Sequence, residues 1–301
     1  MMLPVVMNSN YERLAVIDDY NSFIWTTRYY TCGDFELCVD ANEKNMQLFQ
    51  KDYFILRDDD ENAGIVEDIK IQRDEDLHEI LIISGRFLPS ILGRRIIAEQ
   101  TTVTGNIGSC VNQLINQNVI SPAISARIIS GISIDTYSVS GSMKAQYTGK
   151  NLLDTITDIS NAYGLGYKMI FDDDLQMMFS MYAGIDRTYD QSVNPVVIFS
   201  DLYDNLLSSE YEENYKNIAS AVLVAGEGEG LNRKTLWVTD GSTGLNRHEV
   251  YKDQRQIRSD SGDISDAEYN ELLQEAGKES LTQYTAAFAG TVYFDNIKYK
   301  E

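Results

Sequence analysis

The sequence has no long apolar run and no targeting segment at its start. No stretch approaches the ~20 apolar residues that a membrane span needs. Residues Met1 to Met7 lack both the basic region and the length of a signal peptide. These absences predict a soluble chain, made in a cytoplasm and without membrane insertion.

Basic residues are scarce. The chain has 25 lysines and arginines against 46 acidic residues, a formal charge of -21. Such a chain repels a phosphate backbone instead of releasing its counterions, which predicts no tight nucleic-acid binding. The acidity is typical of a soluble protein, and an alternative is an acidic lumen past which DNA slides without sticking.

Cysteine and histidine are too few to suggest a metal site or a disulfide framework. Cys32, Cys38 and Cys110 are an odd number without CxxC spacing, so three free thiols are expected. The two histidines, His78 and His248, come without an HExxH motif or a third imidazole. We therefore expect no histidine metal centre.

What is present is an ordinary globular composition. Hydrophobic residues make up 43% and charged residues 24% of 301 residues, so neither disorder nor a fibrous repeat is indicated. A chain of this length can form two or three domains.

The first hundred residues have the pattern of short strands. In Asp34–Asp40 the apolar side chains fall on every second position, which places them on one face of a strand. Similar segments are expected at 53–57, 64–72 and 78–84, with loops at 58–62 and 73–76. Strands at this spacing are typical of an antiparallel barrel or sandwich.

The middle third has helical periodicity. Apolar residues recur from Ile107 at helical spacing, which predicts a helix near 106–117. A second helix is expected between Asn151, which can cap its start, and Gly164, which can end it in the left-handed conformation. Two strands and the turn that joins them should follow, at 166–171, 175–182 and 172–174.

β character returns from Pro195. Strands are expected at 196–199, 219–225, 235–239 and 287–299. One long helix, 264–285, interrupts them, because Ser265 and Glu268 form a capping box. The last strand has no partner after it, so either the sequence stops short of a final domain or this strand pairs elsewhere.

These segments predict a mainly β fold with an α+β insert. The expected domains are an N-terminal β-barrel-like domain at 1–98, an inserted α/β domain at 99–190, and a second β-rich domain at 191–301.

Three segments could carry chemistry, but a structural role fits each better. The glycine-rich run 226–230 lacks the following helix of a phosphate loop, and its glutamates would repel phosphate. The acidic turn 172–174 lacks EF-hand spacing, and Gly141-Ser142 lacks a G-x-S-x-G elbow. With 46 acidic residues, carboxylate pairs ~5–9 Å apart arise by chance. We therefore expect no catalytic, cofactor-binding or metal-binding residues.

Tyrosine is frequent, at 19 residues. Some could line an interface, where tyrosine is favoured, or cap a β core, and the sequence leaves both open. These tyrosines are Tyr29, Tyr30, Tyr203, Tyr211 and Tyr215.

Several segments, in this order, resemble the siphophage and prophage tail-tip proteins related to baseplate hub proteins. Together they extend over most of the chain. They are Ile17-Asp18, 22–30, 33–37, 80–85, Arg86-Phe87-Leu88, 94–97, 184–188, Phe199-Ser200, Asn205-Leu206 and 225–228.

The resemblance implies tube-like antiparallel β-barrel domains with an inserted α/β domain, assembled as a ring, with a trimer expected. It implies a structural component of the virion tail that connects the tail tube to the tip and lines the DNA passage, with other tail proteins as partners. Synthesis would take place in the bacterial host cytoplasm. The family's motifs look structural, so no catalytic residue is carried over.

Two other functions compete with this one. A tail-associated hydrolase of peptidoglycan or surface glycan would bring a recognisable catalytic module, which the sequence does not show. A carbohydrate-binding module would need exposed aromatics in a groove, whereas Trp25 and Trp237 both fall in expected strands.

Overall fold

The computed structural model describes residues 3–73, 79–200, 202, 208–259, 264–284 and 287–293. The chain divides into two units, Met1–Ala183 and Gly184–Glu301. The three-domain division at 98/99 and 190/191 remains a prediction.

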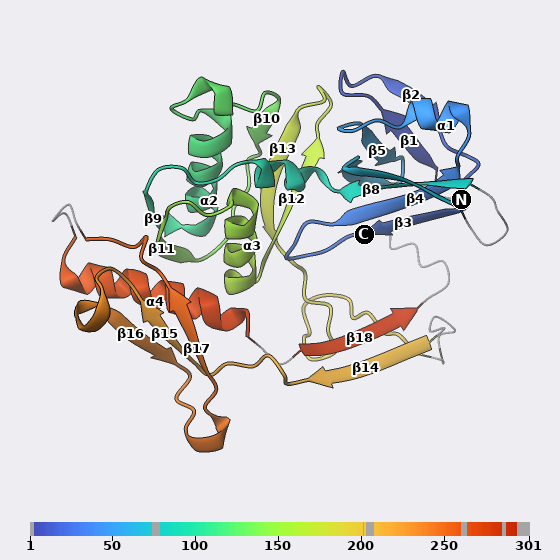
Figure 1. Ribbon diagram of the computed structural model, residues 1–301. Helices are drawn as coiled ribbons and strands as arrows, with labels where there is room; N and C mark the ends of the chain where they lie inside the picture. The colour runs from blue at the N-terminus through green and yellow to red at the C-terminus, as the bar shows by residue number, and fades with distance from the viewer. Residues whose placement is uncertain are drawn as a thin grey trace. The chain divides into compact units, whose positions relative to one another are not determined.

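The alternating segments of the N-terminal region form two antiparallel sheets of four strands (Figure 1). The first has the order β2–β1–β5–β6 and the second β3–β4–β8–β7. Their bounds are β1 (Pro4–Met7), β2 (Arg13–Val16), β3 (Ser22–Thr26), β4 (Asp34–Asp40), β5 (Phe54–Arg57), β6 (Asp60–Ile65), β7 (Asp68–Arg73) and β8 (Glu79–Arg86), with helix α1 (Glu43–Leu48) between β4 and β5. Val6 and Ile55 from one sheet share a buried core with Leu37 and Ile83 from the other, so the two sheets face each other.

The structure corrects three expectations for this region. Among the described residues these sheets are open, and they do not close into a barrel. The single strand expected at 64–72 is wrong, because the chain leaves one sheet after Ile65 and enters the other at Asp68. The loop expected at 58–62 is only a two-residue turn, because Asp60 already belongs to β6.

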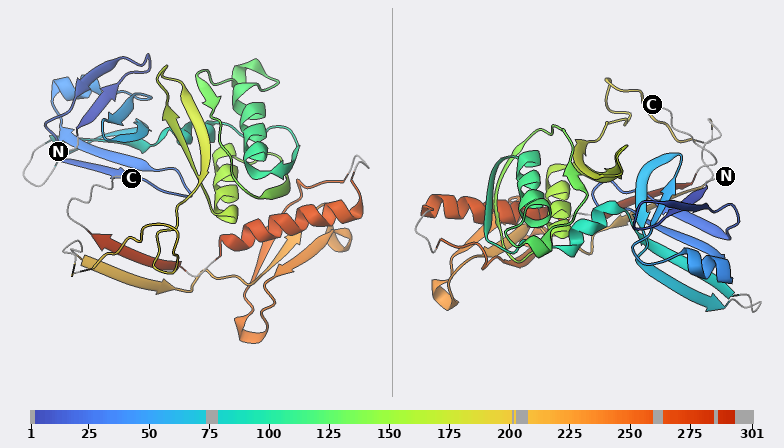
Figure 2. Two further views of the ribbon diagram at one scale, coloured as in Figure 1. Left: turned by 180° about the vertical axis from the view of Figure 1, so that it is seen from behind. Right: turned by 90° about the horizontal axis from the view of Figure 1, so that it is seen from above.

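The following segment adds helices and a second set of strands to the same unit. The elements are a 3-10 helix (Leu88–Arg94), β9 (Thr101–Asn106), α2 (Ile107–Ile115), a π-helical turn (Asn116–Ile120), a 3-10 turn (Ser125–Arg127), β10 (Ile132–Ile134), β11 (Ser142–Tyr147), α3 (Leu152–Tyr163), β12 (Leu165–Phe171) and β13 (Met177–Ala183). β9 pairs with β11, while β13 lies between β10 and β12. Helices α2 and α3 lie side by side against these strands and bury Val111, Leu114 and Ile156 (Figures 1 and 2).

Local capping explains where α3 begins and ends. The Asn151 side chain accepts hydrogen bonds from the backbone N–H groups of Leu153 and Asp154. Gly164 ends the helix at φ +67°, a left-handed conformation that glycine adopts without a Cβ clash. The helix expected from this pair of residues is therefore confirmed.

The second unit contains a three-stranded sheet, a helix and a two-stranded ribbon. Its elements are β14 (Ser208–Asn214), β15 (Ala221–Ala225), a 3-10 turn (Gly230–Asn232), β16 (Thr235–Thr239), a 3-10 turn (Gly244–Asn246), β17 (Glu249–Asp253), α4 (Asp266–Thr282) and β18 (Ala287–Tyr293). β15 is central, antiparallel to β16 and parallel to β17. Helix α4 lies along one face of these strands (Figure 2).

The capping box predicted for α4 is confirmed, since Ser265 and Glu268 bond reciprocally. The strand expected at 196–199 is wrong, because within the described part of the chain these four apolar residues belong to no strand. The Val197 N–H donates to the Arg187 carbonyl. The last strand does pair elsewhere: β18 is antiparallel to β14. No helix among the described residues is long and apolar enough to span a membrane.

Candidate assembly surfaces

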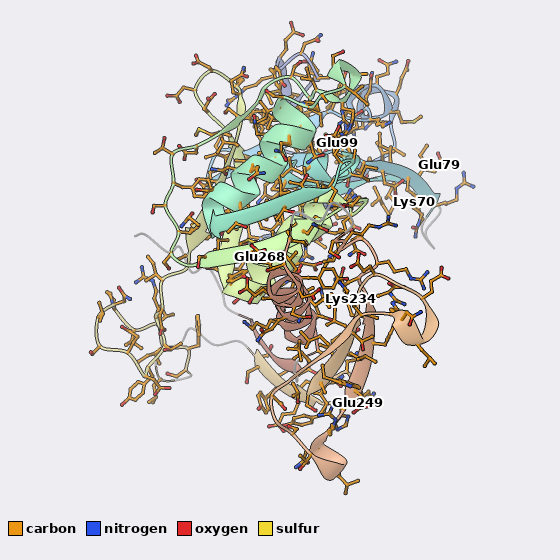
Figure 3. All side chains as sticks on the ribbon, turned by 90° about the vertical axis from the view of Figure 1, so that its left-hand side faces the viewer. Lys70, Glu79, Glu99, Lys234, Glu249 and Glu268 are labelled. Atoms are coloured by element: carbon orange, nitrogen blue, oxygen red, sulfur yellow. The ribbon has the colours of Figure 1, made fainter. Side chains whose placement is uncertain are left out.

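The open edge of the second N-terminal sheet is strand β7. Among the described residues β7 pairs only with β8, and all six of its residues are exposed. Ile69 and Ile71 lie opposite the fully buried Ile83 and Leu81, yet they are 40% and 54% exposed. The apolar face of the sheet therefore continues onto β7 without cover. Figure 3 labels Lys70 on β7 and Glu79 on β8.

The ribbon of β14 and β18 is a second exposed element. Its seven residue pairs are in continuous register, and no side chain of β14 is buried. An isolated two-stranded ribbon is at best marginally stable in water. β14 carries Glu210, Glu212 and Glu213, whereas β7 carries Lys70 and Arg73. The two exposed strands therefore have opposite charge.

A buried tyrosine holds the glycine-rich turn after β15. The Tyr269 hydroxyl accepts a hydrogen bond from the Glu227 N–H at 2.7 Å and donates one to the Ile257 carbonyl at 3.1 Å. A Cβ at Gly226 would lie 2.0 Å from this hydroxyl, so the turn needs glycine there. The acidic turn expected between two strands is confirmed.

The Glu227 carboxylate is fully engaged in this turn. It accepts bonds from the Ser259 N–H at 2.9 Å and the Ser259 hydroxyl, and it pairs with Lys234 at 3.0 Å. Burial alone raises the pKa of Glu227, but these bonds outweigh burial and bring the pKa down to about 2. Lys234 also lies 3.4 Å from Asp266 at the start of α4, where Figure 3 labels Lys234 and Glu268. The carboxylate thus supports the turn and is not left facing a ligand.

A polar pocket of about 430 Å³ lies beside the π-helical turn. Asn118 is buried there; its amide donates to the Leu114 carbonyl at 2.9 Å, and its Oδ1 accepts from Arg127 at 3.2 Å. Gln113, Gln117 and Thr102 also line the pocket, and no aromatic residue is among its described lining. It could form hydrogen bonds with a polar ligand, but it offers no stacking surface for a sugar ring.

The structure does not bring the other candidate residues together. The His248 N–H donates to the Ser220 hydroxyl at 2.9 Å within the sheet of the second unit, while His78 lies outside the described residues. Asp172 accepts from the N–H groups of Asp174 and Gln176, a hairpin turn. Ser142 begins β11. In the described part of the chain no three His, Cys, Asp or Glu side chains are grouped as metal ligands.

The aromatic candidates have different environments. Tyr29 packs edge-on against Tyr182 and bonds the Gly164 carbonyl, whereas Tyr30, Tyr211 and Tyr215 are exposed. Tyr203 lies outside the described residues. Trp25 stacks against Phe87 in the N-terminal core, while Trp237 lies on an exposed sheet face.

The cysteines are free thiols in the structure. Cys38 and Cys110 are buried and Cys32 is half-buried. Burial raises the pKa of Cys32 to about 11, so this thiol is a poor nucleophile at neutral pH.

The open sheet edge at β7 was not predicted from the sequence, although the alternation of apolar and polar residues there indicates a strand. Ile69 and Ile71 alternate with Lys70 and Gln72 as in a strand with one covered face, and only the pairing shows that β7 is the last strand.

The chain is similar to several solved tail proteins. The prophage tail protein gp18 from Listeria monocytogenes EGD-e has 11% identity and a TM-score of 0.47, over 84% of this chain and 73% of that one. The tail protein from Neisseria meningitidis MC58 has 15% identity and a TM-score of 0.46, over 90% and 74%. The 43 kDa tail protein of prophage MuSo2 from Shewanella oneidensis has 14% identity and a TM-score of 0.48, over 93% and 79%. Because these TM-scores lie below 0.5, the similarities carry no argument about the function of this chain.

The sequence comparisons are more decisive. No curated protein sequence matches the chain. A family description does match it, over residues 3–299, which is nearly the whole length. The chain belongs to the family of Siphovirus ReqiPepy6 Gp37-like proteins.

Proposed function

We propose that the chain is a structural subunit of a phage or prophage tail tip, of the baseplate-hub kind. It would connect the tail tube to the tip and line the passage for DNA. The observation that carries this proposal is the match to a siphovirus family over residues 3–299. Its location would be the virion tail, after synthesis in the host cytoplasm, and its partners would be other tail proteins.

The proposed assembled state is a ring, with three copies as the expected number. In this arrangement β7 of one subunit lies beside β14 of the next. Both strands are exposed, and an unpaired strand edge is an aggregation hazard unless another chain covers it. A contact between two different surfaces of the same chain generates a closed ring when the rotation closes.

Charge supports the pairing of these two strands. Lys70 and Arg73 of β7, which lie three positions apart, would face Glu210 and Glu213 of β14, which have the same spacing. Opposite charges across strands stabilise a sheet by about 0.2–1 kcal/mol per pair. A strongly acidic ring would also let DNA pass without binding it, since each copy carries a formal charge of -21.

The proposal gives the chain no catalytic step. Polar groups in the candidate segments make structural hydrogen bonds: Asp172 within its hairpin, His248 within its sheet, and Glu227 to Ser259.

Charge reversal on the two strands tests the ring. In chemical cross-linking of the full chain at high concentration, Lys70→Glu with Arg73→Glu should reduce the trimer about tenfold, because like charges then face each other. Adding Glu210→Lys and Glu213→Lys to the same chain should restore it. Lys44→Glu with Lys51→Glu is the matched control, since both lysines are exposed and lie outside the two strands.

Two results would contradict this arrangement. One is a wild-type chain that yields no trimer. The other is a trimer that the control pair weakens as much as the β7 pair, because net charge instead of strand pairing would then govern assembly.

A further inference from the structure

The second unit contains a four-residue motif that recurs 14 positions later. Gly230-Leu231-Asn232-Arg233 recurs as Gly244-Leu245-Asn246-Arg247. Each copy makes a 3-10 turn that opens with its glycine at positive φ, +54° and +60°, and each leads into a strand, β16 and β17. The two strands flank β15 and run in opposite directions. The repeats are therefore related by an approximate two-fold rotation about the centre of the sheet.

The arginine of each repeat stacks on the aromatic residue of the other. Leu223 of β15 lies opposite Trp237 on one side and Tyr251 on the other. The Arg247 guanidinium lies 4.9 Å from the Trp237 ring centroid, and that of Arg233 lies 5.9 Å from the Tyr251 centroid. We name Leu223, Trp237, Tyr251 and the two arginines the aromatic face. Each arginine also pairs with an acid of β17, Arg233 with Asp253 and Arg247 with Glu249. Figure 3 labels Glu249.

No described element of the second unit covers the aromatic face. Helix α4 buries Val222 and Val224 on the opposite side of β15. On the aromatic face Trp237 is 44% and Tyr251 56% exposed, and Leu223 is only half-buried. Yet β15 reads Ala-Val-Leu-Val-Ala, a continuous apolar run typical of a strand with both faces covered. The sequence of β15 therefore suits a second covering layer.

Two leucines lie in the turns at the ends of this sheet. Leu231 and Leu245 are fully exposed, one in each repeated turn. The turns lie at opposite ends of the sheet, because β16 begins opposite Ala225 and β17 begins opposite Ala221. Trp, Tyr and Arg are the residues most enriched where proteins bind proteins, and exposed leucines add apolar area.

The size of the face limits what can cover it. Three strands of five residues span about 17 Å by 14 Å, on the order of 240 Å², against about 800 Å² per partner in a standard interface. This is too small for a stable dimer through this face alone, and it matches one helix, about 10 Å wide. Glu249 and Asp253 are already paired with the two arginines of this face, so it is the charge of -21 over the whole chain that favours a cationic partner.

We infer that the aromatic face docks one amphipathic helix of a partner protein, with lysine or arginine beside its apolar stripe. This helix completes a three-layer arrangement of α4, the sheet and the partner. The contact is separate from the ring pairing of β7 and β14 and does not depend on it.

A synthetic helix tests the inference on the full chain. The probe is a labelled 18-residue Leu/Lys peptide with leucines at i, i+3, i+4 and i+7, and its control has the same composition in scrambled order. Fluorescence anisotropy should show that the wild-type chain binds the ordered peptide. The affinity should be about tenfold weaker for the double variant Leu231→Ser with Leu245→Ser, and also for Trp237→Ala. Both leucines are fully exposed, so their replacement does not endanger folding. Leu202→Ser, at a leucine of the same unit that is 95% exposed, should leave binding unchanged.

Several outcomes would overturn the inference. Equal binding of the scrambled peptide, or equal affinity in all variants, would mean that the peptide binds acidic surface at large. A dimer in sedimentation that the two leucine replacements abolish would assign the face to a second copy. Competition by soluble peptidoglycan fragments would assign it to a sugar.

Discussion

At the scale of single residues, Tyr269 connects three separate segments of the second unit. Its ring is fully buried on α4, and its hydroxyl bonds both the turn after β15 and the segment that precedes α4. A phenylalanine at position 269 would keep the packing of the ring. The Glu227 N–H and the Ile257 carbonyl would then lose the hydroxyl as their hydrogen-bond partner.

We therefore expect Tyr269→Phe to lower the stability of the second unit by about 1–3 kcal/mol. Amide hydrogen exchange in α4 measures this for the unit alone. Tyr251→Phe is the control: its hydroxyl accepts an exposed hydrogen bond from Arg233, so its effect should stay within about 0.5 kcal/mol. Equal effects of the two replacements would show that the buried hydroxyl has no special role.

Glu227 makes the same turn sensitive to acid. Its pKa is about 2 in the folded chain against an ordinary value of 4.5. A carboxyl with a lowered folded pKa stabilises the fold fully above its unfolded pKa and loses that contribution as the pH falls towards the folded value. The stability difference between the wild type and Glu227→Gln should therefore be largest above pH 4.5 and shrink between pH 4.5 and pH 2.

Hydrogen exchange as a function of pH measures this difference. Ser259→Ala removes one of the bonds to the carboxylate and so raises the folded pKa of Glu227; the loss should then be smaller and should be complete at a higher pH. A difference that stays constant from pH 6 to pH 2 would contradict the assigned role of Glu227.

At the scale of elements, Gly85 lets the two N-terminal sheets approach each other. A Cβ on Gly85 would lie 1.9 Å from the backbone oxygen of Ile65, and backbone cannot move aside as a side chain can. We expect Gly85→Ala to cost at least about 1–3 kcal/mol, the usual range for overpacking. In urea unfolding, Gly93→Ala should cost far less, because its Cβ would meet Leu153 at an ordinary 3.4 Å. A reversed order would contradict this packing.

Elements with a strong local signal could be predicted from the sequence. The alternation in Asp34–Asp40 gives β4 with the same bounds. The cap at Asn151 with the stop at Gly164 gives both ends of α3. The capping box at Ser265 gives the start of α4 within two residues, whereas its end at Thr282 comes three residues before the predicted one. These signals lie within a few residues of one another, so no distant partner is needed to interpret them.

Elements that depend on distant partners could not be predicted in the same way. The run 64–72 alternates like one strand, but the break between Ile65 and Asp68 exists because the two halves pair with β5 and β8 in different sheets. β9 and β11 are largely polar and pair across the intervening segment 107–141, since Asn106 lies opposite Ser142. The open sheets, and hence the exposed edge of β7, follow from such pairing alone.

The candidate surfaces show the same limit. Tyr211 of β14 and Tyr215 just after it were identified from the sequence as possible interface residues. The exposure of Trp237 could not be predicted in this way, because it depends on which face of its sheet α4 covers. The repeated Gly-Leu-Asn-Arg motif can be read from the sequence. The stacking of each arginine on the aromatic residue of the other repeat cannot, because it depends on the pairing of the strands.

At the scale of the whole molecule, the chain is a strongly acidic member of a siphovirus protein family, and β7 and β14 are exposed. Each feature fits a subunit that is completed by its neighbours. An acidic subunit also suits a passage through which DNA slides, because the contacts that hold DNA come from lysine and arginine.

The position of the protein in the particle tests this central claim most directly. A tagged copy, introduced into a phage or prophage that carries the gene and labelled with gold, should appear by electron microscopy at the tip of the tail. The account predicts one cluster of label per particle at that end. Label along the whole tube, on the capsid, or only in the particle-free fraction of the lysate would contradict it.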